Sequence, residues 1–178
     1  MNSKTLFLLD LDHTLIYGSY APSETSRLLF AYSQFLKVYE RPYAREFVKE
    51  IQSRGEIIVF TTAKEDYASM VSKGLDIQPV QLLSRAACSK KGDSYRKRIR
   101  KTWLKKYSRI VVIDDSPQVW EVPQGIELDW IIPREFRGDA NDHELLSLIE
   151  KFDNSSMRVI GTLQSLYPKP DRMWTYHM

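Results

Sequence analysis

Three continuous apolar runs, each followed directly by a polar cluster, constrain the fold of this chain more than any other feature. The runs are Thr5–Leu9, Glu56–Phe60 and Arg109–Ile113, and residues 129–132 form a weaker fourth. A strand that is apolar at every position is covered on both faces, as in the middle of a parallel sheet. We therefore expect these runs to be strands of one parallel sheet.

Helical patterns separate the apolar runs. Residues 45–54 place Phe47, Val48 and Ile51 on one face, and Gly55 follows as a typical C-terminal cap. The same pattern predicts helices over two more segments, 67–73 and 96–107. Strands that alternate with helices indicate right-handed crossovers and a parallel sheet.

A last helix is expected near the end of the patterned region. Asn141 is its predicted N-cap, and Glu144 stands at the reciprocal position of a capping box. Four apolar residues then face inward: Leu145, Leu148, Ile149 and Phe152.

The predicted fold class is therefore α/β, a Rossmann-like three-layer core with a central parallel sheet. Two segments fall outside the strand–helix alternation, residues 17–41 and residues 77–94. The second has the length of a small β-hairpin insertion. We expect one domain over residues 1–154, followed by a C-terminal tail, 155–178, that docks on the domain or is partly disordered.

Composition fits a soluble intracellular protein. The chain has 178 residues, 43% of them hydrophobic and 28% charged, which is ordinary for one globular domain. Its net charge of +3 is well short of a nucleic-acid-binding signature, so a nucleic-acid partner is not expected. The single cysteine, Cys88, excludes an internal disulfide, fits a reducing compartment and is expected to be a small packed side chain. No stretch approaches the ~20 apolar residues of a transmembrane segment.

The polar clusters after the strands contain the candidate site. Asp10 and Asp12 follow the first run, Thr61 and Thr62 the second, and Asp114–Asp115 the third. The carboxyl ends of parallel strands face one crevice, so four aspartates are expected to converge there. Such a cluster either holds a proton or binds a cation, and all-oxygen ligands favour Mg²⁺ where a phosphate completes the coordination. Aspartates that merely end strands and cap helices would not account for an Asp-Leu-Asp sequence continuous with a buried strand.

These residues resemble known motifs. Residues 10–15, Asp-Leu-Asp-His-Thr-Leu, resemble the DxDxT motif of haloacid-dehalogenase-type phosphatases. Other segments are similar to the branch of RNA polymerase II C-terminal-domain phosphatases and NLI-interacting-factor-like proteins. They are Arg41-Pro42 with Glu46-Phe47, residues 60–63 with Tyr67-Ala68, residues 95–97, residues 112–117, and residues 136–139 with Asp142 and Glu144-Leu145.

The resemblance implies a role for each matching residue. Asp10 would be the nucleophile, and Asp12 would protonate the leaving oxygen, later activate water, and bind the metal through its carbonyl. Thr61 and Lys97 would hold phosphate oxygens. Substrate contacts are expected from Thr14, Thr62 and Arg85. The metal ligands are expected among Asp10, Asp12, Asp114 and Asp115, with Asp115 favoured over Asp114.

Two assignments have alternatives. Lys101 would replace Lys97 if the register of this basic segment slips by four residues. The ring of His13, where many relatives carry Gly or Glu, is expected to point to solvent rather than to act in catalysis.

The expected activity is that of a magnesium-dependent phosphatase that forms an aspartyl-phosphate. With a hairpin insertion and no large cap, the site would admit phosphorylated Ser/Thr or Tyr side chains of a protein or peptide. The alternatives are a phosphatase of small molecules or nucleic-acid ends, and a non-catalytic module that binds a phosphorylated partner or a lipid surface. The basic segment 90–106 is either a solvated face or a dock for an acidic partner. Aromatic residues line the substrate groove or pack in the core, the candidates being Tyr32, Phe35 and Tyr39.

Overall fold

A computed structural model describes residues 4–23 and 25–153 of the chain. Its central sheet has five parallel strands in the order β11-β9-β1-β5-β6. The strands are β1 (Thr5–Leu9), β5 (Glu56–Phe60), β6 (Gln81–Leu83), β9 (Arg109–Ile113) and β11 (Asp129–Ile131). All four apolar runs become strands of this sheet, which confirms the predicted α/β fold with a central parallel sheet.

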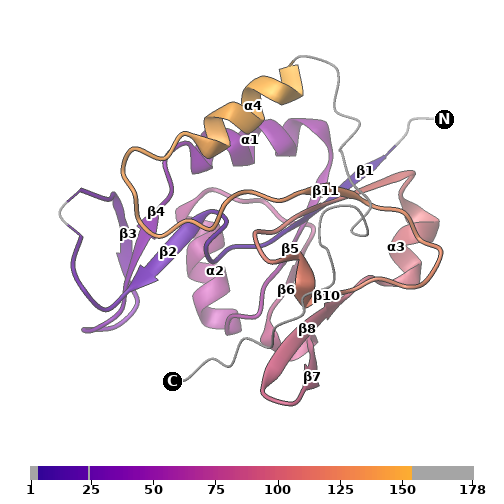
Figure 1. The fold of residues 1–178 in the computed structure, drawn as a ribbon, viewed down its shortest axis with the longest axis horizontal. Helices are drawn as coiled ribbons and strands as arrows, with labels where there is room; N and C mark the ends of the chain where they lie inside the picture. The colour runs from indigo at the N-terminus through magenta and orange to yellow at the C-terminus, as the bar shows by residue number, and fades with distance from the viewer. Residues whose placement is uncertain (1–3, 24, 154–178) are drawn as a thin grey trace, which may run out of the picture.

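Alternate residues of each central strand face opposite layers of the core. Phe7 and Leu9 pack in one cluster with the apolar faces of three helices, α1 (Ala44–Arg54), α2 (Glu65–Gly74) and α4 (Glu144–Asp153). Leu6 and Leu8 pack in a second cluster with Trp103 of α3 (Lys101–Lys106). Burial on both faces explains why the strands are apolar at every position. Figure 1 shows α1 and α4 packed side by side.

Two small sheets complete the fold. An antiparallel sheet in the order β2-β4-β3 follows β1 and consists of β2 (Ile16–Ser19), β3 (Leu28–Ala31) and β4 (Lys37–Glu40). It lies at the left of Figure 1 and is formed by the segment that the strand–helix pattern did not cover. The other sheet has the order β10-β8-β7, with β7 (Ser89–Lys91), β8 (Ser94–Arg98) and β10 (Trp120–Glu121). Two 3₁₀ turns, η1 (Arg85–Ala87) and η2 (Pro117–Val119), lie beside it in sequence.

The predicted helix over 96–107 is wrong in its first half. Residues up to Arg98 belong to β8, and the helix begins only at Lys101. Lys97 and Ile99 are buried whereas Arg98 and Arg100 are exposed, an alternation typical of a strand. The alternation of a strand could not be recognised in the sequence because Lys97, a charged residue, occupies one of the buried positions.

The hairpin also differs from the predicted insertion over 77–94. Within that segment β6 joins the central sheet through its pairing with β5. The antiparallel hairpin is the β7–β8 pair, so it extends past Ser94 to Arg98. The hairpin therefore includes Lys97.

The last helix starts later than predicted. It begins at Glu144, whose backbone N–H donates to Asp142 Oδ1 at 3.0 Å. Asn141, the predicted cap, donates its own backbone N–H to Asp139 Oδ1 at 2.9 Å. The carboxylate of Asp142, one residue further along the chain than the predicted cap, accepts the hydrogen bond from the first turn of the helix.

Gly55 ends α1 as predicted, but for a different reason. Its N–H donates to Ile51 O at 3.1 Å, and its backbone is extended rather than left-handed. A Cβ at this position would come within 2.4 Å of the carbonyl oxygen of Thr5. The close approach of the chain to β1 therefore requires glycine here.

No helix among residues 4–23 and 25–153 is long and apolar enough to cross a bilayer. The predicted tail, 155–178, lies outside the described residues.

Candidate active site

Two buried carboxylates meet where neighbouring strands end. Asp10 follows β1 and donates its backbone N–H to Ile113 O at 2.9 Å, which continues the β1–β9 pairing. Asp114 follows β9 and donates to Ile131 O at 3.2 Å. The side chains are 9% and 1% exposed, respectively. The sheet register therefore places both carboxylates at its carboxyl edge, as the sequence predicted.

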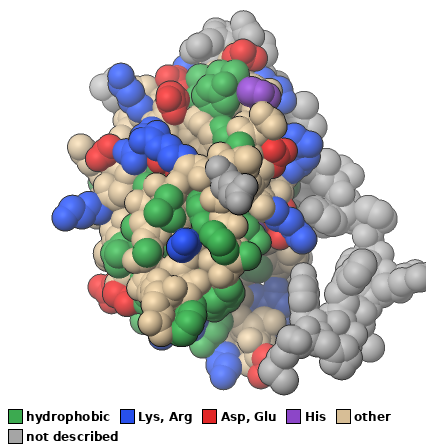
Figure 2. Space-filling view, turned by 90° about the vertical axis from the view of Figure 1, so that its left-hand side faces the viewer, with side chains coloured by type: hydrophobic (Ala, Val, Ile, Leu, Met, Phe, Trp, Pro, Cys, Tyr) green, Lys and Arg blue, Asp and Glu red, His purple; other side chains and the backbone are tan. Residues whose placement is uncertain are grey.

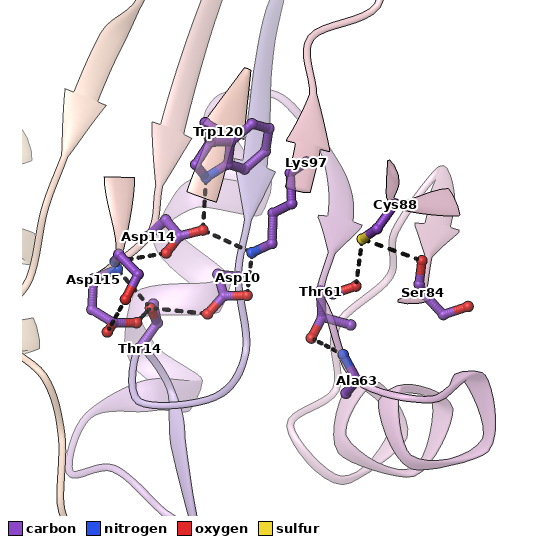
Figure 3. Close-up of polar contacts among 11 residues, drawn as sticks. Asp10, Thr14, Thr61, Ala63, Ser84, Cys88, Lys97, Asp114, Asp115 and Trp120 are labelled. Carbon is purple, nitrogen blue, oxygen red and sulfur yellow. Dashed lines mark hydrogen bonds and ion pairs between the residues drawn. The ribbon is translucent and has the colours of Figure 1, made fainter. Parts of the chain in front are cut away.

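Lys97 lies between these carboxylates. Its Nζ donates to Asp10 Oδ1 at 2.5 Å and to Asp114 Oδ2 at 2.7 Å (Figure 3). Burial lowers the pKa of this ammonium, but the two aspartates outweigh burial and raise the pKa above its ordinary value. Lys101, the alternative lysine, is exposed on α3. Of the two lysines, the structure brings Lys97 into the cluster.

Trp120 fixes the same group of side chains. Its indole Nε1 donates to Asp114 Oδ2 at 2.7 Å, and the ammonium of Lys97 lies 5.3 Å from its ring centroid. The other oxygen of Asp114, Oδ1, accepts the backbone N–H of Ser116 at 2.8 Å. Both oxygens of Asp114 are thus already bound by donors within the protein.

Asp115 and Thr14 connect the loops after β9 and β1. The hydroxyl of Thr14 donates to Asp115 Oδ1 at 3.0 Å and accepts the backbone N–H of Asp115 at 3.2 Å. Asp115 Oδ2 accepts from the hydroxyl of Ser116 at 3.0 Å. Thr14 is fully buried and holds Asp115 in place, and its predicted contact with substrate stays a prediction.

The acidic cluster carries more negative charge than Lys97 neutralises. One ligand oxygen from each of Asp10, Asp114 and Asp115 lies within 4.8 Å of the others. Burial raises the pKa of Asp10 well above its ordinary value; Lys97 opposes the shift, and Asp114 adds to it. Burial, and then the neighbouring Asp114, raise the pKa of Asp115. Hard carboxylate oxygens with excess charge suit a divalent cation such as Mg²⁺.

The carboxylate of Asp12 is not one of these three. It is partly exposed, and its Oδ1 accepts the hydroxyl hydrogen of Tyr67 at 2.8 Å. Burial is the main cause that raises its pKa, and the hydrogen bond from Tyr67 opposes the shift. The predicted acid–base role of Asp12 requires this side chain, whereas its predicted metal contact uses its backbone carbonyl.

The residues after β5 lie beside this cluster. Thr61 is buried, and its Oγ1 accepts the backbone N–H of Ala63 at 3.1 Å (Figure 3). Arg85 is exposed, and its Nε donates to the carbonyl oxygen of Thr62 at 2.8 Å. Its guanidinium lies 5.0 Å from the ring centroid of Tyr95, so it connects the end of β5 to the hairpin.

Cys88 is half-buried next to Thr61. Its Sγ lies 3.7 Å from Thr61 O and 3.9 Å from Ser84 O. Burial raises the pKa of the thiol, so it is not an activated nucleophile.

The side chain of His13 is 40% exposed, in line with the expectation that its ring points to solvent, but the ring also contacts the protein. Its Nδ1 donates to the carbonyl oxygen of Phe136 at 3.0 Å, and the Phe136 N–H donates back to His13 O at 2.7 Å. The backbone of His13 is left-handed, with φ 61°, in the tight turn after Asp12. The ring therefore fastens this turn to the segment before α4.

The aromatic candidates have different environments. Tyr39 is 2% exposed and its hydroxyl accepts the backbone N–H of Ser23, so it belongs to the core. Phe35 is 65% exposed. Tyr32 is partly buried, with its ring edge-on to Tyr67 at 5.1 Å.

Three contacts of the site were not predicted. Tyr67 and Arg41 stand in recognisable motifs, but nothing local in the sequence indicates their partners. The third residue, Trp120, follows the last aspartate motif, and no sequence pattern indicated that it belongs to the site. Tyr67 binds Asp12 across 55 positions and Arg41 binds Asp142 across 101, whereas Trp120 binds Asp114 only six positions before it.

Comparison with known proteins agrees with the motifs. Residues 4–161 match the family described as NLI interacting factor-like phosphatase. This chain belongs to that family. Similar relatives in Dictyostelium discoideum are a "CTD small phosphatase-like protein 2", 32% identical over 82% of this chain and 26% of the relative, and a "Probable C-terminal domain small phosphatase", 30% identical over 85% and 50%. The chain thus spans half or less of the length of these relatives.

A solved structure similar to this member of the NLI interacting factor-like family is "The Structure of Fcp1, an essential RNA polymerase II CTD phosphatase". It is 21% identical, with a TM-score of 0.47 over 84% of this chain and 49% of the other.

Proposed function

We propose that this chain is a magnesium-dependent phosphatase that removes phosphate from Ser/Thr or Tyr side chains of proteins through an aspartyl-phosphate on Asp10. The observation that carries the proposal is Lys97, held between Asp10 and Asp114 at the carboxyl edge of the sheet. A binding module has no need of a nucleophilic carboxylate beside a buried cation. The family's description as phosphatases supports the same reaction.

The proposed chemistry begins at Asp10. One carboxylate oxygen attacks phosphorus while Asp12 gives a proton to the leaving oxygen, and Asp12 then takes a proton from the water that hydrolyses the aspartyl-phosphate. Lys97 offsets the charge on the phosphoryl oxygens during transfer. Asp114 keeps Lys97 in position, because its own oxygens are occupied by Lys97, Trp120 and Ser116.

The donor set fits Mg²⁺. Asp10, Asp115 and the carbonyl of Asp12 would hold the ion, and Asp114 would contribute mainly through Lys97. Bound Mg²⁺ would reduce the repulsion between the Asp10 carboxylate and the phosphate dianion. The proximity of an Asp10 oxygen to an Asp115 oxygen, within 4.8 Å, supports the part of these two residues in this assignment.

Phosphate contacts are proposed from the residues around the cluster. Thr61 and Thr62 lie at the end of β5, and Arg85 reaches them from η1. The hydroxyl of Thr14 is engaged by Asp115, so its contribution would be to order the loop after β1.

A phosphorylated peptide is the substrate class that the surface favours. The β2-β4-β3 sheet faces the viewer in Figure 2, and hydrophobic side chains are exposed on that face among Lys and Arg side chains. This sheet adjoins the site, since Tyr32 packs on Tyr67 and Tyr67 binds Asp12. An extended peptide offers apolar side chains to such a face, whereas a small metabolite does not.

The basic segment 90–106 would supply a dock for acidic residues of that peptide. Lys90, Lys91, Lys101 and Lys105 are exposed, whereas Arg98 pairs with Glu121 and Lys106 with Glu56. Lys97 is buried in the site and does not contribute to this surface.

Hydrolysis of para-nitrophenyl phosphate tests the reaction class. We expect turnover with Mg²⁺, none with EDTA, and none for Asp10→Asn. Asp76→Asn is the matched control, because that carboxylate is 82% exposed and pairs with Arg45 at the surface, away from the acidic cluster. Turnover that survives Asp10→Asn, or no turnover by folded wild-type protein with Mg²⁺, would contradict the proposal.

Peptides of one sequence that carry phosphoserine, phosphothreonine or phosphotyrosine then test the substrate class. We expect a higher kcat/KM for at least one peptide than for the corresponding free phosphoamino acid. Equal values would favour a small-molecule phosphatase.

A further inference from the structure

Tyr67 belongs to one of the segments that resemble the family motifs, but the proposed chemistry assigns it no role. It lies on α2, is 7% exposed, and donates its hydroxyl hydrogen to Asp12 Oδ1 at 2.8 Å. Burial first, and then the charge of Asp12, raise the pKa of the phenol above its ordinary value. A carboxylate oxygen accepts hydrogen bonds, so the phenol is the donor in this contact.

The ring of Tyr67 is held in place by its neighbours. Tyr32 packs against it edge-on at 5.1 Å, and Phe30 packs against it at 6.2 Å. The hydroxyl of Tyr32 in turn donates to Asp66 Oδ2, next to Tyr67 on α2, at 2.7 Å. On the β2 side, a Cβ at Gly18 would come within 3.5 Å of the hydroxyl oxygen of Tyr67. The hydroxyl thus has one position, against Asp12.

This contact leaves the two oxygens of Asp12 unequal. Oδ1 accepts from Tyr67, whereas no side chain among residues 4–23 and 25–153 donates a hydrogen bond to Oδ2. A phenol has a single hydrogen to donate, so the carboxyl oxygen that receives it acts as acceptor and the acidic proton belongs on the other oxygen.

We propose that Tyr67 is a positioning residue that orients Asp12 so that Oδ2 presents the proton to the leaving oxygen. This inference rests on the proposed function. In the step itself, a bond forms between an oxygen of Asp10 and phosphorus, the bond from phosphorus to the leaving oxygen breaks, and the proton moves from Asp12 Oδ2 to that oxygen. Tyr67 exchanges no proton and keeps its hydrogen bond to Oδ1 throughout.

The leaving group distinguishes this role from packing or substrate binding. A nitrophenolate departs without a proton, whereas phenolate and alkoxide leaving groups depend on the acid. Tyr67→Phe keeps the buried ring and removes only the hydroxyl. If the Asp12 carboxyl loses its orientation, turnover should therefore fall for substrates with basic leaving groups. Damage to packing or to phosphate binding would instead reduce turnover of all substrates alike.

The test compares kcat/KM for para-nitrophenyl phosphate and phenyl phosphate in wild type, Tyr67→Phe and Tyr107→Phe. For each substrate, kcat/KM reports only the steps up to phosphoryl transfer. The later hydrolysis of the aspartyl-phosphate, which both substrates share, therefore does not mask the effect. For Tyr67→Phe we expect little change with para-nitrophenyl phosphate and a loss of about 10-fold or more with phenyl phosphate, a part of the usual contribution of a general acid. Tyr107→Phe, which also removes one buried tyrosine hydroxyl that binds a carboxylate, that of Glu56, should leave the ratio of the two substrates unchanged.

A double-mutant cycle completes the test. In an Asp12→Asn background, Tyr67→Phe should have no further effect on the ratio of the two substrates, because the group that it orients is gone. An equal loss with both substrates, or an unchanged phenyl phosphate rate, would overturn the positioning role while the phosphatase assignment stands. Absence of any wild-type turnover would instead overturn the proposed function and this inference with it.

Discussion

The guanidinium of Arg41 is bound by the carboxylate of Asp142 through two hydrogen bonds of 3.0 Å, from Nε and Nη2. The side chain of Arg41 is completely buried, and its third donor, Nη1, binds the carbonyl oxygen of Thr14 at 3.0 Å. The ring of Phe136 covers the guanidinium at 5.3 Å. One ion pair thus connects β4, the loop of the active site and the start of α4.

Removal of Arg41 should therefore destabilise the whole domain. Arg41→Met leaves the carboxylate of Asp142, which is only 11% exposed, without its cation, and loss of one partner of a buried pair costs about 3–5 kcal/mol in unfolding free energy. Arg134→Met is a matched control, because Arg134 pairs with Glu144 at the start of the same helix but is 78% exposed. That control should change the unfolding free energy far less, because an exposed ion pair contributes little to stability. Urea denaturation of both variants measures the difference, and similar small losses would show that the buried pair contributes no more than a surface pair.

Lys97 should be essential for catalysis, whereas its neighbour on the strand should not. Lys97→Met removes the cation between two buried carboxylates, and we expect kcat for para-nitrophenyl phosphate to fall by about 100-fold or more. Arg98→Met is the control, since Arg98 points outward from the same strand and pairs with Glu121 at the surface. Comparable activity of the two variants, with both folded by circular dichroism, would argue against a role of Lys97 in phosphoryl transfer.

Glu56 predicts a specific acid dependence of stability. Hydrogen bonds from Lys4 and then Tyr107 lower the pKa of its carboxyl to about 2, against about 4.3 in an unfolded chain. Because the folded pKa is depressed, the stabilisation is fully present above pH ~4.3 and is lost as the pH falls toward 2. The side chain is partly exposed, so we expect less than about 1 kcal/mol at neutral pH.

Denaturant unfolding of wild type and Glu56→Gln between pH 7 and pH 3 measures this contribution. The difference in unfolding free energy should be constant down to pH ~5 and then shrink. Glu127→Gln replaces an exposed carboxylate and is the control. A difference that grows as the pH falls would have the wrong sign for a depressed pKa.

The parts of this structure that sequence could predict are those with a local signal. The apolar runs of β1, β5 and β9 identify the centre of the sheet, and their ends identify the edge at which Asp10 and Asp114 meet. β6 was not predicted as a strand of this sheet because it has three residues, of which Leu83 alone is buried. The first half of the predicted helix over 96–107 is a strand because Lys97, although charged, occupies an inward position.

The remaining site contacts join segments that no local pattern relates. Arg41 and Asp142 are separated by 101 positions, and Tyr67 and Asp12 by 55. Resemblance marked the motifs in which these residues stand, but the pairing depends on how β4, α2 and the loop before α4 pack. Only the three-dimensional arrangement shows that Tyr67 binds the proposed general acid and that the partly exposed ring of His13 also binds a backbone carbonyl.

The central claim is that Asp10 carries the phosphoryl group. Asp12→Asn should still accept phosphate from para-nitrophenyl phosphate, whose leaving group requires no proton, but should hydrolyse the intermediate slowly for lack of a base. Rapid mixing with Mg²⁺ should therefore release a burst of about one equivalent of nitrophenolate per enzyme, and mass spectrometry after acid quenching should find one phosphoryl group on the peptide that contains Asp10. A label on any other residue, or turnover without a burst or a label, would contradict the account.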